Sequence, residues 1–349
     1  SLEKAGAAHM YLMQGIALPK DPDRYVDNDF KRKKLEEVRL LAETFKDDPA
    51  LFAWGIGNEI DLDKANIPEA WSFVEELAKE IKKVDHNHLV ATVISHKLKA
   101  LELIARYAPS LDFVGINSYG NIFEVGKLFE DSPYRGPFII TEWGPTGWWE
   151  TRKTEWGAPI EQTSEEKRIV YETRYKKAIG GNPRCLGSFV FLWGQKEERT
   201  PTWFSMFVEN KVEGLPLNGE KTPMVEAMER VWTGTEPEQT APVVGQLTIN
   251  GISFGPKVKS NTGFDVEVIA ADKEGDRLTY VWEVLKEATV TATGGAYEPR
   301  PDRVGKVRTT ETGNVRISID TPGYYRLYVY VLDHTGYVST ANIPFAVIE

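Results

Sequence analysis

Two glutamates that each end a short apolar run are the residues of this sequence best suited to chemistry. Glu59 closes the stretch Phe-Ala-Trp-Gly-Ile-Gly-Asn-Glu, and Glu142 closes Phe-Ile-Ile-Thr-Glu. Cleavage of a glycosidic bond requires such a pair, because one acid protonates the leaving oxygen while the second carboxylate attacks the anomeric carbon or activates water. The plain alternative is that both are polar caps of strands. One glutamate at a strand end is weak evidence for a catalytic pair, whereas two are harder to dismiss.

The elements that would position these glutamates form a repeating pattern up to about residue 232. Amphipathic helical stretches separate apolar runs that are apolar on both faces, as in parallel sheets covered by helices. This alternation predicts an α/β fold built of βαβ units. In a (β/α)8 TIM barrel the C-terminal strand ends form the active-site face, so Glu59 and Glu142 would face one another there. The predicted strands are 9–18, 51–56, 89–94, 113–116, 138–140 and 186–192, and the predicted helices are 30–45, 68–84, 97–107, 125–129 and 164–179.

The pattern changes after a polar, proline-bearing stretch at residues 233–242. Short strand candidates follow, separated by Gly, Pro, Asp and Asn turns. Arg326, Tyr328 and Tyr330 alternate with apolar residues at a period of two. We therefore predict an antiparallel β-sandwich of immunoglobulin type. The predicted domains are a partial barrel at 1–234, a linker at 235–242 and the sandwich at 243–349.

Charge and composition narrow the classes of partner. The net charge of -10 and the absence of a basic stripe argue against nucleic acid. No apolar run is long enough to span a bilayer, and no signal peptide is present in the sequence. His86 and His88 lack an obvious third ligand, and there is no Gly-rich phosphate loop. We therefore expect neither a catalytic metal nor a cofactor.

Four motifs in order resemble the barrel of the retaining glycosidases that carry glutamates on strands four and seven, and the resemblance is strongest to glycoside hydrolase family 2. These are Trp-Gly-Ile-Gly-Asn-Glu at 54–59, Phe-Val-Gly-Ile-Asn-Ser-Tyr at 113–119, Ile-Thr-Glu-Trp-Gly at 140–144 and Gly-Ser-Phe-Val-Phe-Leu-Trp at 187–193. That family includes β-galactosidases and β-glucuronidases. The resemblance implies that Glu59 is the acid/base and Glu142 the nucleophile.

The same resemblance assigns substrate contacts. Asn58 would hydrogen-bond the sugar 2-hydroxyl, Tyr119 would orient the nucleophile, and Trp193 would be the stacking platform of the -1 subsite. Asn117 and Trp143 complete the predicted binding residues. A tyrosine hydroxyl suits its role because it bonds a carboxylate without adding charge, and an indole face suits the C–H face of a sugar. Burial in the aromatic core is the competing interpretation for Tyr119 and Trp193.

Loops after the last two predicted barrel strands are less informative. Trp148, Trp149 and Trp203 fit outer subsites or ordinary packing equally well. The polar stretch 194–200 suits either a substrate-contacting loop or an exposed one.

The sequence departs from the family at its start. Residues 11–16 resemble the third barrel strand, so the first two strands and the preceding sandwich domains are absent. A barrel closes only with all its strands, and open edges invite aggregation. We expect a fragment of a longer enzyme, with little or no activity alone, whose missing N-terminal part is a candidate partner.

Residues 266–283 resemble a strand-turn-strand segment of cadherin-like and polycystic-kidney-disease-like modules, with Trp282 as the core tryptophan. Asp272, Glu274 and Asp276 offer oxygen ligands for calcium, although a solvated turn is the simpler interpretation. Such modules accompany exported enzymes, which implies an extracellular or periplasmic protein.

The sequence thus predicts a retaining glycosidase that cleaves a β-linked oligo- or polysaccharide. Two alternatives stay open, a transglycosylase with the same residues and a non-catalytic carbohydrate-binding or structural surface protein. The retaining mechanism predicts carboxyl groups roughly 5–5.5 Å apart.

Overall fold

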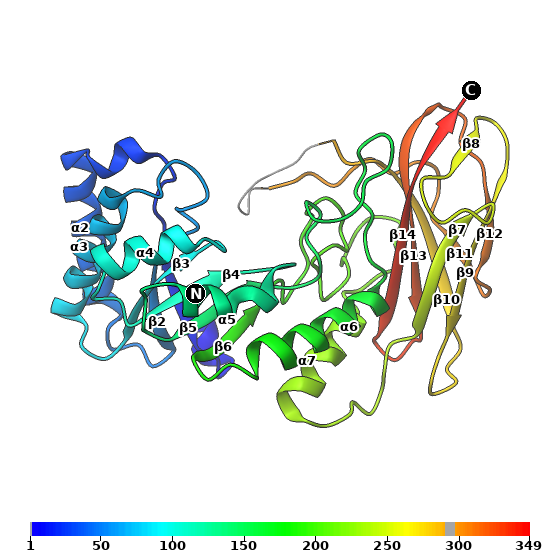
Figure 1. Ribbon diagram of the computed structural model, residues 1–349. Coiled ribbons are helices and arrows are strands. Elements are labelled where there is room, and N and C mark those ends of the chain that lie inside the picture. Colours follow the sequence, from blue (N-terminus) through cyan, green and yellow to red (C-terminus); the bar gives the residue numbers. More distant parts are fainter. Residues whose placement is uncertain (1, 290–296) are drawn as a thin grey trace. The chain divides into compact units, whose positions relative to one another are not determined.

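The computed structural model describes residues 2–289 and 297–349, and these form two compact units (Figure 1). Unit 1 comprises residues 1–143 and 177–189, and unit 2 comprises residues 144–176 and 190–349. The two units are described separately below. The predicted domain boundaries stay a prediction.

Unit 1 is built on a sheet whose strands lie side by side in the order of the chain. The pairs β1–β2, β2–β3, β3–β4 and β4–β5 are parallel. Parallel strands in chain order with helices between them are the arrangement of consecutive units in a (β/α)8 barrel. The α/β class and the parallel sheet are therefore confirmed. The strands are β1 (Leu12–Ile16), β2 (Leu51–Asn58), β3 (Leu89–Ile94), β4 (Phe113–Asn117), β5 (Phe138–Trp143) and β6 (Cys185–Val190).

The helices between these strands follow the predicted periodicity closely. Helix α3 begins with Pro68, whose missing N–H is harmless in the first turn, and it buries the predicted stripe from Trp71 to Ile81. Asp27 caps α2 by accepting the N–H groups of Asp29 and Phe30. Helices α2 and α3 run side by side in Figure 1. The helices of unit 1 are α1 (Leu2–Ala7), α2 (Asn28–Phe45), α3 (Pro68–Val84), α4 (Leu98–Tyr107) and α5 (Val125–Asp131), with 3-10 turns at Pro22–Tyr25 and Ile122–Glu124.

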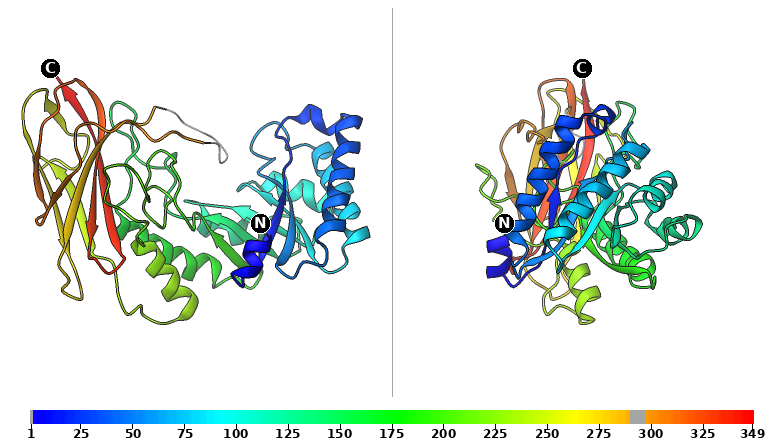
Figure 2. Two further views of the ribbon diagram at one scale, coloured as in Figure 1. Left: turned by 180° about the vertical axis from the view of Figure 1, so that it is seen from behind. Right: turned by 90° about the vertical axis from the view of Figure 1, so that its left-hand side faces the viewer.

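Unit 2 combines helices with two β-sheets. Figure 2 shows its strands, coloured from yellow-green to red, gathered into one body. One sheet has the order β11-β10-β13-β14-β8 and the other β12-β9-β7. Helix α6 (Ser164–Arg174), which continues as a π-helix at Tyr175–Ile179, packs on α7 (Pro223–Thr233). The strands are β7 (Val243–Ile249), β8 (Lys257–Lys259), β9 (Phe264–Ala271), β10 (Thr279–Lys286), β11 (Arg308–Thr310), β12 (Asn314–Ile317), β13 (Gly323–Leu332) and β14 (Val338–Ile348).

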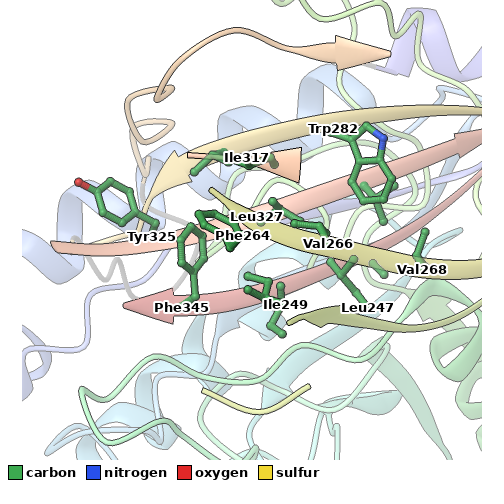
Figure 3. Close-up of a cluster of buried hydrophobic side chains, with 14 of the residues drawn as sticks. Leu247, Ile249, Phe264, Val266, Val268, Trp282, Ile317, Tyr325, Leu327 and Phe345 are labelled. Atoms are coloured by element: carbon green, nitrogen blue, oxygen red, sulfur yellow. The ribbon is translucent and has the colours of Figure 1, made fainter. Parts of the chain in front are cut away.

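The two sheets enclose a common hydrophobic core (Figure 3). Leu247, Phe264 and Val266 come from the three-stranded sheet, and Leu327 and Phe345 from the five-stranded one. Trp282 lies in this core as predicted, and its indole N–H donates to the Thr310 hydroxyl at 2.8 Å. The C-terminal region is thus a two-sheet sandwich, whereas its immunoglobulin type stays a prediction.

The five-stranded sheet is buried on its other face as well. Tyr328 and Tyr330 of β13 point into a second core, which they share with Leu215 and Leu217 of the segment before α7. The predicted period of two in β13 therefore separates two cores rather than a core from solvent. Residues 200–217 and the strands consequently form one packed body in unit 2.

No helix within the described residues is long and apolar enough to cross a membrane.

Candidate active site

The backbone around Glu59 is bent so that the glutamate follows the last residue of β2. The register with β3 shifts between Ile56 and Asn58, and Gly57 lies at φ +75°. Glu59 itself has φ +51°, a left-handed conformation that costs a non-glycine residue free energy. Its N–H still donates to the Val93 carbonyl of β3 at 2.9 Å. Strand pairing therefore continues up to Glu59 and fixes where its side chain starts.

The environment of Glu59 favours its protonated form. Burial raises the pKa of the carboxyl, and the nearby charge of Asp61 acts in the same direction. A hydrogen bond from Asn117 and the charges of Lys20 and Lys97 oppose this shift without cancelling it. A half-buried carboxyl with a raised pKa is suited to donate a proton.

Asn117, the last residue of β4, links the ends of three strands. Its Nδ2 donates to Asn58 Oδ1 at 3.1 Å, and its Oδ1 accepts the Thr141 hydroxyl at 2.8 Å. The side chain is buried, so these bonds replace water at an otherwise costly polar group. The structure thus brings together Asn58, Asn117 and, through Asn117, Glu59.

Glu142 stands opposite Asn117 in the register of β4 and β5. The Tyr119 hydroxyl donates to Glu142 Oε2 at 3.3 Å, and the Ser118 N–H donates to the Glu142 carbonyl at 2.8 Å. Tyr119 is buried, and Glu142 is partly exposed. A neutral phenol that bonds a carboxylate restricts its orientation and keeps its charge available.

The two predicted tryptophans have different surroundings. Trp143 of β5 is fully buried in unit 1. Trp193 belongs to unit 2 and is 47% exposed, with Phe207 and Trp232 as ring neighbours, the latter at a centroid distance of 5.5 Å. An exposed indole supported by other rings is a suitable surface for a sugar. The roles of both tryptophans in substrate binding stay predictions.

Three further residues of the site region were not singled out from the sequence. Asp61 is fully buried and accepts both the N–H and the hydroxyl of Ser95, the hydroxyl at 2.5 Å. Lys97 donates to the carbonyls of Asp61 and Leu62. These bonds hold the loop that follows Glu59 against the end of β3. The burial of Asp61 depends on Ser95 and Lys97, which lie 34 and 36 residues later in the chain, so no local pattern indicates it.

Two residues of the candidate calcium turn bond to protein groups. Asp272 Oδ1 accepts the Asp276 N–H at 2.9 Å, and Glu274 accepts the Thr240 hydroxyl at 2.9 Å. Within residues 2–289 and 297–349, no group of three or more His, Cys, Asp or Glu side chains is arranged to hold a metal ion.

Strand ends in unit 1 thus carry one carboxyl of raised pKa and a second carboxylate bonded by a tyrosine. Proton donation by the first and attack by the second is a chemical division of labour available to such a pair.

The chain is similar in sequence to two rice proteins. One is mannan endo-1,4-beta-mannosidase 4 of Oryza sativa subsp. japonica, 27% identical over 203 residues, which are 47% of this chain and 42% of that protein. The other is putative mannan endo-1,4-beta-mannosidase 9 of the same plant, 26% identical over 186 residues, or 43% and 44% of the two chains. The chain spans less than half the length of these relatives. No known protein-family description matches it.

A crystal structure of beta-glucuronidase from Bacteroides uniformis superposes with a TM-score of 0.46 at 14% identity, over 99% of this chain and 40% of that one. In sequence this chain is therefore similar to glycosidases, and unit 1 has the strand order of consecutive βα units of an α/β barrel. The similarity in sequence to the two plant mannosidases is more specific than this likeness in strand order.

Proposed function

We propose that this chain carries the catalytic residues of a retaining glycoside hydrolase, with Glu59 as acid/base and Glu142 as nucleophile. The observation that carries the proposal is the hydrogen-bonded strand-end network in unit 1. It holds one carboxyl through Tyr119 and the surroundings of the other through Asn117.

The roles follow from the two environments. Burial raises the pKa of Glu59, so its carboxyl keeps a proton to higher pH than an exposed glutamate does. Glu142 accepts a hydrogen bond from a neutral phenol, which suits an ionised nucleophile. The two glutamates would then differ in charge at the start of the reaction, as double displacement requires.

In the first step, Glu59 transfers its proton to the leaving glycosidic oxygen while the C–O bond breaks. A Glu142 oxygen forms a bond to the anomeric carbon, which gives a covalent glycosyl-enzyme. In the second step, the Glu59 carboxylate takes a proton from water as the water oxygen attacks the same carbon. The bond to Glu142 breaks, and both glutamates return to their initial states. The two inversions retain the anomeric configuration.

The proposed substrate is a β-linked oligo- or polysaccharide, with β-1,4-mannan as the first polymer to test. This choice rests on the names of the two rice relatives, which match less than half of the chain. Asn58 would bond the sugar 2-hydroxyl, and Trp193 would stack on a ring of the substrate. A family 2 type of barrel, an immunoglobulin-like accessory domain and export from the cell belong to the same proposal.

The test measures release of reducing sugar by the full-length protein from β-1,4-mannan and from chromogenic β-mannosides, β-galactosides and β-glucuronides. We expect Glu59→Gln and Glu142→Gln each to lower kcat/KM by about 10²–10⁴-fold or more. Glu102→Gln is the matched control, since Glu102 is an exposed glutamate of α4 that pairs with Lys99.

Unchanged activity in either glutamate variant would contradict the assignment. Binding of a polysaccharide without any hydrolysis by the wild-type protein would favour the non-catalytic alternative.

A further inference from the structure

Unit 2 contains an open cavity of about 550 Å³ that lies between a hairpin and one edge region of the sandwich. The hairpin spans residues 153–159, and the sandwich contributes the segments 286–289 and 321–325. Such a volume falls in the range of pockets that hold small molecules, about 300–1,000 Å³. None of the residues discussed above as catalytic lines it.

Two aromatic rings form one wall of this cavity. Trp156 and Tyr324 stack nearly parallel, with centroids 5.4 Å apart and an interplanar angle of 10°. Tyr324 is 56% exposed, although it is a large aromatic side chain. Exposure of an aromatic pair beside a cavity provides flat apolar area for a ligand with an apolar face.

Hydrogen bonds within the hairpin and at its base fix the backbone that carries Trp156. The Thr154 N–H donates to the Ala158 carbonyl at 2.9 Å, and the Gly157 N–H donates to the Thr154 carbonyl at 3.0 Å. The Ala158 N–H donates to the Thr154 hydroxyl at 3.0 Å. At the base of the hairpin, the Pro159 carbonyl accepts a hydrogen bond from the guanidinium of the buried Arg326 at 2.8 Å. The platform is therefore preorganised, which lowers the entropy cost of binding.

Polar groups complete the lining. Arg199 is the residue of strained backbone there, at φ +64°, and its N–H donates to the buried Glu298 at 2.8 Å. Lys286, Thr289 and Thr321 add donors and hydroxyls. Strained residues persist where the surrounding structure over-determines them, and they concentrate at ligand sites.

A pyranose ring has the matching chemistry, because one face is a patch of C–H groups and the rim is a ring of hydroxyls. We infer that this cavity is a carbohydrate-binding site of unit 2, which takes a segment of β-linked oligosaccharide on Trp156 and Tyr324. The ligand class is that of the proposed substrate, so the inference rests on the proposed function in this respect alone. Binding at the cavity does not require catalysis.

The test counts binding events by isothermal titration on the full chain carrying Glu142→Gln, which prevents turnover. The ligands are hexasaccharides of β-1,4-linked mannose, glucose and galactose and one uronate-bearing oligosaccharide. We expect Trp156→Ala to remove one binding event or weaken it at least about tenfold, Tyr324→Ala to weaken the same event less, and Trp156→Phe to retain it.

Tyr11→Ala is the matched control, because Tyr11 is 74% exposed and lies in unit 1. The single variant Trp156→Ala, with Glu142 intact, should hydrolyse short chromogenic glycosides as fast as the wild type. Unchanged hydrolysis also shows that this variant is folded. The uronate arm tells whether Arg199 and Lys286 select an acidic sugar.

Equal binding by Trp156→Ala and the control would overturn the inference and leave the proposed hydrolase intact. Loss of hydrolysis by the wild type together with Trp156-dependent binding would overturn the proposed function and leave this site standing.

Discussion

Glutamates occupy two very different settings in this molecule. In unit 1, Glu59 and Glu142 end strands, are partly exposed, and have neutral side chains, Asn117 and Tyr119, as hydrogen-bond partners. In unit 2, Glu161 is fully buried and its charge is paired with Lys167 at 2.5 Å.

Every oxygen of the buried glutamate is satisfied. Glu161 accepts the hydroxyls of Thr200 and Thr202 and the amide of Asn342 in addition to Lys167. Burial alone raises the pKa of this carboxyl, but Lys167 and the hydrogen bonds outweigh burial and keep the pKa below its usual value. Glu161 and Lys167 therefore form a structural ion pair, whereas Glu59 of unit 1 has no such cation bonded to it among the described residues and its raised pKa favours protonation. The difference separates a structural ion pair from a candidate acid and base.

Substitution of Lys167 should have the largest effect and is the strongest test of this comparison. Lys167→Met leaves Glu161 as a buried charge without its cation, and we expect a loss of about 3–5 kcal/mol in the free energy of unfolding. Lys127→Met, which opens the exposed pair with Asp131, should cost far less, because solvent screens that pair. Denaturant titration of both variants makes the measurement. Equal losses would mean that the buried pair is not a structural element of unit 2.

Glu197 provides a pH test of unit 2. Both of its carboxylate oxygens are buried and have no hydrogen-bond partner among the described residues. Burial, with Glu209 nearby, raises its pKa from 4.5 to about 8. The folded state therefore holds a proton that the unfolded state releases above 4.5. Stability contributed by the protonated form is full below 4.5 and is lost as pH rises to about 8.

We expect the free energy of unfolding to fall by a few kcal/mol across that window. Glu197→Gln should flatten this part of the curve, measured by denaturation at several pH values. Glu238→Gln, at an exposed position, is the control. A wild-type slope that survives in Glu197→Gln would contradict the assignment.

Substitution of Asn117 tests the environment of Glu59 in unit 1 through the pKa of its carboxyl. The hydrogen bond from Asn117 lowers the pKa of Glu59, so Asn117→Ala should raise that pKa further. Because the acid must be protonated, activity falls as pH rises through this pKa. The alkaline limb of the kcat/KM profile should accordingly move to higher pH. Thr141→Val, which removes only the donor to Asn117 Oδ1, should leave the limb in place. A downward shift in Asn117→Ala would count against the interpretation.

The smallest expected effect concerns the helix that carries Lys167. Thr163 and Glu166 form a capping box at the start of α6, with the Thr163 hydroxyl accepting the Glu166 N–H. Thr163→Ala should cost about 1 kcal/mol of stability, and Thr163→Ser should restore most of it. Thermal unfolding measures both. No change in Thr163→Ala would show that α6 is held by packing alone.

Local patterns predicted the barrel-like part well because its elements are locally consistent. The run 89–94 and the helix 68–84 coincide with β3 and α3, since a strand that is apolar but for Thr92 and a stripe from Trp71 to Ile81 each have one plausible structure. The strands β8 and β11 have three residues each, which is too short for a period of two to predict them. Helix α7 was also missed, although Pro223 at its start and Gly234 at φ +72° after its end mark its limits.

The roles of the predicted site residues stay predictions, and the local motifs do not show which other residues support them. Motifs placed Asn58, Asn117 and Tyr119 near the two glutamates, because strand ends of a parallel sheet meet at one edge. They gave no sign of Asp61 under the Glu59 loop. Nor did they predict that Glu197, in a polar loop, is buried. Both depend on contacts between residues far apart in the chain, which a local pattern does not contain.

The central claim is that Glu142 attacks the anomeric carbon. The direct measurement is mass spectrometry of the full-length protein after incubation with a 2-deoxy-2-fluoro β-glycoside of the sugar that it hydrolyses fastest, since fluorine slows both steps and lets the intermediate accumulate. Our account predicts a single glycosyl adduct on Glu142, absent in Glu142→Gln and present in Glu102→Gln. An adduct on another residue, or hydrolysis with inversion and no adduct, would contradict it.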